Sequence, residues 1–166
     1  TRALDPHSFG EYRLLWLVVG TVMAVATLNM CGTLYFFVPR SPPERKRLHV
    51  HQTMLYLAAA GLVCAAAVSP WNPLLPPAVH PLREYGLLVP AFVALWVVAT
   101  LLDFLPTIDE RIRWQAYATL GVTALRTLLV AAGAWASGEF LVVLWLLVAV
   151  VALKVVLLFV YVRHRH

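Results

Sequence analysis

The stretch PRSPPERKRLHVH, residues 39–51, places four basic side chains between two long apolar segments. These side chains are Arg40, Arg45, Lys46 and Arg47. In membrane proteins the cytoplasmic loops carry an excess of Lys and Arg, and this excess orients the whole chain. If the loop is cytoplasmic, it fixes the side of the membrane on which every other connection lies.

The composition on both sides of this loop is that of a chain surrounded by lipid. Of the 166 residues, 61% are hydrophobic and 13% are charged, and the mean hydropathy is +0.79. Soluble domains are about 25% charged, so we expect one integral membrane domain over residues 1–166. The net charge of +5 comes from basic residues at the ends of apolar segments, which indicates membrane topology and not nucleic-acid binding.

Helix signals divide the chain into five expected membrane spans. The spacing of a capping box occurs at residues 8–11, 41–44 and 107–110, and each box precedes an apolar run. The runs are long enough to cross the hydrocarbon region of a bilayer. The sequence therefore predicts an all-α integral membrane protein, a bundle of five transmembrane helices over residues 9–38, 42–68, 81–105, 108–136 and 139–162.

Prolines and small residues refine this prediction. Pro39 and Pro106 are expected to end helices, and Pro90 to bend the helix that contains it. The second helix has the smallest side chains, including Ala58 and Gly61, and small residues let helices approach closely in lipid. We therefore place the second helix at the centre of the bundle.

The distribution of basic residues predicts the orientation. With the 39–51 loop inside, the inner side holds eight Lys and Arg residues and the outer side holds three. We expect a multi-pass protein of the prokaryotic plasma membrane, with the N-terminus outside and the C-terminus inside. The inner residues are Arg40, Arg45, Lys46, Arg47, Arg111, Arg113, Arg163 and Arg165, and the outer ones are Arg2, Arg13 and Arg83.

Polar side chains within the expected spans are candidates for function, because charges at membrane depth are rare. At about 1.5 Å per residue, Asn29, Arg126 and Lys154 fall in one layer near the middle of the membrane. No carboxylate of the sequence lies at that depth, and Asp103 on the inner side is the nearest. Because a lysine stem can bend several ångströms, we predict an ion pair between Lys154 and Asp103.

Arg126 has three alternative interpretations. It donates hydrogen bonds to Asn29 or to backbone carbonyls freed near Pro90, it pairs with an acid on another subunit, or it contacts an anionic ligand or conducted ion. Its helix carries a small and polar stripe that should face protein or water and not lipid. The stripe consists of Thr119, Thr123, Arg126, Thr127 and Gly133.

The cofactor signals centre on His51, near the inner end of the second helix. With His164 it would form a pair of haem ligands, or alone it would bind the metal of a pigment; the other interpretation is an interfacial side chain near lipid head groups. The spacing of His and Cys predicts no metal site, and the motif search predicts no catalytic residue. Arg45, Lys46 and Arg47 are expected to attract anionic lipid.

These observations leave three functional hypotheses. The first is a non-catalytic subunit of a larger membrane complex, of the energy-transducing class (respiratory or photosynthetic), with other membrane subunits as partners. The second is a small transporter or channel that uses Arg126 and Lys154 as a cationic site in the middle of the membrane. The third is the membrane input domain of a sensor.

Overall fold

The computed structural model describes residues 5–165, so Arg2, which the orientation argument places outside, lies beyond the described residues. Within this range the chain is helical, without strands, and five helical segments are long and apolar enough to cross a membrane. This agrees with a multi-pass helical membrane protein. The elements are α1 (Pro6–Ala26), α2 (Met30–Arg40), α3 (Pro43–Ala67), the 3-10 helix η1 (Pro77–Tyr85), α4 (Leu88–Ala99), α5 (Leu101–Ile108), α6 (Ile112–Ser137) and α7 (Phe140–Arg165).

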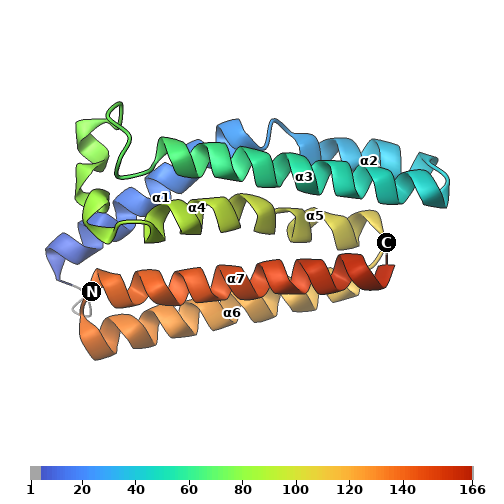
Figure 1. Ribbon diagram of the computed structural model, residues 1–166. Coiled ribbons are helices and arrows are strands. Elements are labelled where there is room, and N and C mark those ends of the chain that lie inside the picture. Colours follow the sequence, from blue (N-terminus) through green and yellow to red (C-terminus); the bar gives the residue numbers. More distant parts are fainter. Residues whose placement is uncertain (1–4, 166) are drawn as a thin grey trace.

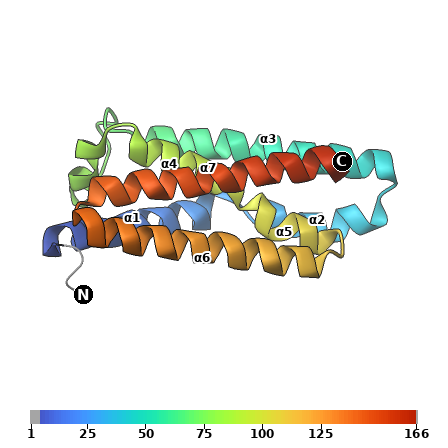
Figure 2. The same ribbon diagram turned by 90° about the horizontal axis from the view of Figure 1, so that it is seen from below.

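The helices run lengthwise in one bundle (Figure 1). The segment α4–α5 lies between α3 on one side and α7 on the other, while α6 lies along one edge beside α7 (Figures 1 and 2). Half of the most apolar 18-residue stretch of α4–α5 is buried inside the bundle, against 28% of the corresponding stretch of α3 and 11% of that of α6. The expectation that the second predicted helix is central was therefore wrong. Its small residues serve a close contact instead, since a Cβ on Gly61 would lie 3.0 Å from the Ala94 carbonyl oxygen of α4.

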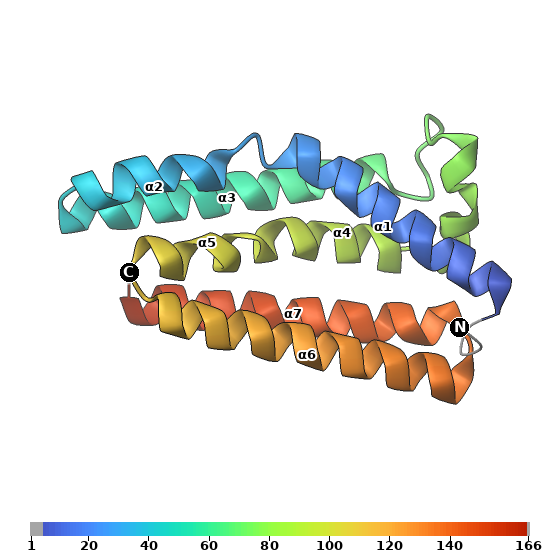
Figure 3. The same ribbon diagram turned by 180° about the vertical axis from the view of Figure 1, so that it is seen from behind.

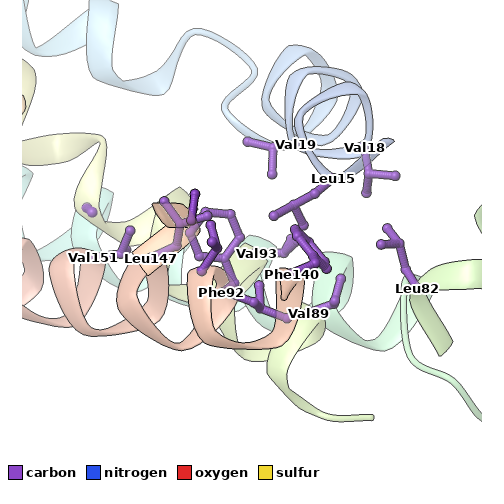
Figure 4. Close-up of a cluster of buried hydrophobic side chains, with 14 residues drawn as sticks. Leu15, Val18, Val19, Leu82, Val89, Phe92, Val93, Phe140, Leu147 and Val151 are labelled. Carbon is purple, nitrogen blue, oxygen red and sulfur yellow. The ribbon is translucent and has the colours of Figure 1, made fainter. Parts of the chain in front are cut away.

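The core consists of two clusters of buried apolar side chains that follow each other along the bundle. In the first cluster, α1, η1, α4 and the first half of α7 converge on Phe92 and Phe140 (Figure 4). In the second, α2, α3, α5 and the second half of α7 pack around residues such as Leu105 and Leu158. Met23 and Cys64 contact both clusters and connect them.

The first predicted helix, residues 9–38, is broken in the structure. α1 ends at Ala26 and α2 begins at Met30, and Figure 3 shows the break beside the middle of α3. Leu28 and Asn29 have positive φ angles of 39° and 57°. Asn adopts this left-handed conformation more readily than most residues, so Asn29 is the residue at which the helix turns. The Tyr56 hydroxyl of α3 donates a 3.1 Å hydrogen bond to the Ala26 carbonyl oxygen at the break.

The third predicted helix, residues 81–105, is also divided. Its beginning forms η1, and Pro90 does not bend a helix because it lies in the first turn of α4, where the missing N–H has no intrahelical partner. The break comes at Thr100, whose hydroxyl lies 3.8 Å from the Met23 sulfur next to the first break. Pro106 lies inside α5, which continues to Ile108. The expected helix end at Leu105, before Pro106, was therefore three residues early.

The predicted capping boxes are not formed. The side chain at the N-cap of α1, α3 and α6 makes no capping hydrogen bond in any of the three helices. Residues 107–110 end α5 and turn the chain instead, with Glu110 at φ 60°. The predicted tight connection between α6 and α7 is present. Gly138 has φ 68° and caps α6, so α6 and α7 pack as neighbours.

Candidate functional site

Lys154 and Asp103 form the polar centre of the bundle. Lys154 Nζ of α7 donates a 2.7 Å hydrogen bond to Asp103 Oδ2 in the first turn of α5, which is the ion pair predicted from the sequence. The side chains are 17% and 39% exposed. Lys154 Nζ also lies 5.9 Å from the centre of the Trp96 ring. The pair joins two residues that are 51 positions apart in the chain, on α5 and α7, and neutralises one of the two cations predicted at membrane depth.

Arg126 lies near this pair but has a different environment. Its guanidinium carbon is 5.4 Å from the centre of the Trp16 ring and 5.9 Å from that of Trp96. A cation over an indole face is stabilised by the ring quadrupole, more strongly where water is excluded. Among residues 5–165, no carboxylate forms an ion pair with Arg126. The aromatic rings therefore hold the guanidinium in place without neutralising its charge.

A cavity of about 260 Å³ connects Arg126 with the ion pair. It lies between α6, α7 and the α4–α5 segment, and its two cations and one carboxylate leave a net charge of +1. Two threonine hydroxyls at its wall are able to donate further hydrogen bonds. The lining residues are Trp96, Leu102, Asp103, Ala118, Thr119, Val122, Thr123, Arg126, Val150, Val151 and Lys154. A single small anion, or a carboxylate that enters from a neighbouring helix, has the complementary charge.

Gln115 connects the beginning of α6 to the same region. Its Nε2 donates a 2.6 Å hydrogen bond to the Asp103 backbone carbonyl oxygen. Its Oε1 atom is buried and accepts no hydrogen bond from the described residues. This contact fixes α6 against α5 close to the break at Thr100. The sequence interpretation did not include Gln115, although an amide three residues after Ile112 in an apolar segment was a signal.

Asn29 does not line this cavity, and its place in one polar layer with Arg126 and Lys154 stays a prediction. It is exposed at the break between α1 and α2, and its side chain packs over the Cα of Gly32. The sequence interpretation assumed a continuous helix through Asn29, whereas the helix is broken there. Among the described residues, neither Asn29 nor a carbonyl near Pro90 forms a hydrogen bond with Arg126, so the structure gives the first interpretation of Arg126 no support.

His51 lies apart from the cavity, near the beginning of α3. Its Nδ1 atom is 2.8 Å from the Arg47 carbonyl oxygen and must carry the proton of that hydrogen bond, because a carbonyl only accepts. His51 lines a groove together with Arg47 and Arg163. The described residues contain no group of three or more potential metal ligands. Binding of haem or a pigment through His51 stays a prediction.

A buried carboxylate near the other end of the bundle was missed from the sequence. Glu11 is 5% exposed, accepts a 2.6 Å hydrogen bond from the Tyr85 hydroxyl, and lies 3.7 Å from His7 Nδ1. Burial, the hydrogen bond to Glu11 and the negative charges of Glu11 and Glu84 raise the pKa of Tyr85. Glu11 had been interpreted as the last residue of a capping box. It joins α1 to η1 instead.

The geometry of the cavity is therefore the main guide to function. Comparison with models of protein families, with characterised proteins and with solved structures gives no match for this chain.

Proposed function

We propose that this chain is a non-catalytic, multi-pass subunit of a larger membrane complex. The supporting observation is the exposed face of α6. Of the five long helical segments α6 is the least covered, since 11% of its most apolar 18-residue stretch is buried. Thr119, Thr123, Thr127 and Ala131 are exposed there at four-residue spacing. Small side chains on one helix face permit close approach of another helix in lipid. The face thus has the character of an interface between membrane helices.

The unpaired charge of Arg126 supports the same proposal. Arg126 belongs to α6 and lines the cavity behind the small-residue face. A charge at membrane depth is costly unless another charge or a polar group neutralises it. A carboxylate from a neighbouring subunit would supply that neutralisation and would couple assembly to the cavity. We infer that Arg126 pairs with such an acid in the complex.

The position of the basic residues supports the predicted orientation. The α2–α3 connection, the start of α6 and the end of α7 lie at one end of the bundle, and the start of α1 lies at the opposite end (Figure 1). The first end is the one rich in Lys and Arg, so we place it inside and the N-terminus outside. A reporter that functions only outside the cytoplasm should be active when it is fused to the N-terminus. An inactive reporter there would reverse the orientation.

We propose a prokaryotic plasma membrane and an energy-transducing complex, respiratory or photosynthetic, as the setting. The support for this class is indirect: most of the described chain lies in the five apolar helices, and the connections 109–111 and 138–139 are short. Such a chain offers its partners mainly a surface within the membrane. The sensor-domain hypothesis has no specific support among the described residues.

Co-purification tests the proposal. The chain, tagged and expressed at its native level, should come out of native membranes in mild detergent with a fixed set of membrane proteins. Thr127→Leu should reduce their yield several-fold, because it puts a large side chain on the small-residue face and prevents the close approach of another helix. Thr21→Leu is the matched control, since both threonines are exposed and donate to the carbonyl oxygen four residues earlier at 2.9 Å. Extraction of the wild-type chain alone, or equal effects of both changes, would contradict the proposal.

A second candidate function is transport of a small anion, and the cavity is the specific observation in its favour. Discontinuous helices commonly form substrate sites in transporters, and here the breaks at residues 27–29 and at Thr100 lie close to each other. Anion flux into liposomes that contain only the purified chain would support this function. That flux should fall strongly in Arg126→Gln and persist in Arg113→Gln. No flux above protein-free liposomes would exclude it.

A further inference from the structure

The groove around His51 is a second site, separate from the cavity at Arg126. It lies where α3 begins and α7 ends, and these two points are at the same end of the bundle (Figures 1 and 2). The groove has a volume of about 500 Å³ and is lined by Arg47, His51, Met54, Phe159, Val162 and Arg163. No residue of this set belongs to the cavity or to the exposed face of α6.

The part of the groove nearest the end of the bundle is positively charged. Arg47 and Arg163 come from helices far apart in the sequence, and both side chains are exposed. No carboxylate of the described residues lines the groove. Because His51 Nδ1 donates to the Arg47 carbonyl oxygen, its Nε2 atom is the ring nitrogen left for another partner. Two guanidinium groups and one imidazole thus surround a space that lacks an anion of the chain's own.

The part of the groove nearer the middle of the bundle is apolar. Arg47, His51 and Met54 follow one face of α3, and Met54 lies about 10 Å deeper in the bundle than Arg47 along the helix axis. On α7, Phe159 is half exposed and lies about one turn deeper than Arg163. The groove therefore changes from charged to apolar in the direction from the end of the bundle toward its middle. A phospholipid changes from phosphate to acyl chain in the same direction.

We propose that this groove binds one anionic phospholipid, with the phosphate at Arg47 and Arg163 and an acyl chain along Met54, Phe159 and Val162. Basic pockets between membrane helices on the cytoplasmic side are known to hold anionic head groups. Arginine suits this role because its planar guanidinium forms paired hydrogen bonds with phosphate oxygens. The site is more specific than the attraction of lipid to a basic loop, since it requires residues from two helices that are far apart in the sequence. It also does not depend on the partner proposed for α6.

A comparison of two double variants tests this site. Phosphatidylglycerol is titrated into the delipidated chain in neutral detergent, and bound lipids are counted by native mass spectrometry. Arg47→Gln with Arg163→Gln should weaken binding of one lipid by on the order of tenfold or more. Arg45→Gln with Lys46→Gln removes the same charge from neighbouring positions outside the groove and should weaken it less than about threefold.

Two further arms make the test decisive. Arg47→Lys with Arg163→Lys retains the charge, so it should bind more tightly than the Gln pair and less tightly than the wild type. Phosphatidylcholine and inorganic phosphate, each used alone as competitor, should displace little phosphatidylglycerol. Equal weakening by both Gln pairs would reduce the site to general attraction by the basic end. Full displacement by inorganic phosphate would make it a site for a free anion. Either result would overturn the proposal.

Discussion

The ion pair between Lys154 and Asp103 makes a quantitative prediction about stability. Its atoms are 2.7 Å apart and its side chains are 17% and 39% exposed, so it lies between the buried and the exposed extremes. Breaking a fully buried pair costs about 3–5 kcal/mol, and an exposed pair contributes about 0–1 kcal/mol. Lys154→Met should therefore lower the free energy of unfolding by about 2 kcal/mol, because it leaves Asp103 without its cation. Asp103→Leu should lower it by a similar amount for the converse reason.

The double variant separates the pair from the effect of each side chain alone. Lys154→Met combined with Asp103→Leu should cost about 1–2 kcal/mol less than the sum of the single changes, since no unpaired charge remains. Equilibrium unfolding in mixed micelles, followed by circular dichroism and tryptophan fluorescence, measures all three. Lys46→Met is the control, because Lys46 forms no ion pair among the described residues. If the two single effects add within about 0.5 kcal/mol, the pair does not couple α5 to α7 and the reasoning fails.

Three further predictions use the same unfolding assay. Tyr85→Phe should cost about 1–3 kcal/mol near neutral pH, because it removes a donor from buried Glu11; no loss would contradict this. Since the pKa of Tyr85 is raised above its ordinary value of 10.0, stability should fall as the pH rises above that value, and fall less in Tyr85→Phe. Asn29→Gly should be neutral or stabilising, whereas Asn29→Val should cost about 1–2 kcal/mol at φ 57°; equal effects would refute a strained turn. Tyr56→Phe should cost about 1 kcal/mol and speed amide exchange of residues 27–30, and unchanged exchange would show that the bond to Ala26 does not hold the break.

The sequence predicted the helices well where hydropathy alone decides. Charged or proline-rich connections separate the five apolar segments, so the five candidate spans and their approximate limits follow from composition. The pairing of Lys154 with Asp103 was also predictable, because only one carboxylate lay within reach of the lysine stem. In both cases one strong physical requirement, burial of apolar surface or neutralisation of charge, leaves few alternatives.

The breaks were not predictable by the same reasoning. No proline or charge interrupts residues 14–38, and the turn depends on Asn29 adopting a left-handed conformation above Gly32, which has no side chain to block it. Pro90 gave the opposite error, because its effect depends on whether it lies in the first turn or the interior of a helix. That position is set by η1, whose packing through Leu82 is a tertiary contact. Residues whose role depends on such contacts carry a weak signal in the sequence.

The two breaks and the cavity together support the proposal that α6 forms the interface with a partner. The breaks are stabilised from within the bundle, by Tyr56 at Ala26 and by the contact of Thr100 with Met23. The carboxylate of Asp103 is already committed to Lys154, and Gln115 holds the backbone of the same residue. Of the two cations that line the cavity, Arg126 keeps an unneutralised charge, and it belongs to the helix with the least covered surface. Since no described carboxylate pairs with Arg126, an anion from outside the described chain would neutralise it, and α6 is the surface on which we propose that it arrives.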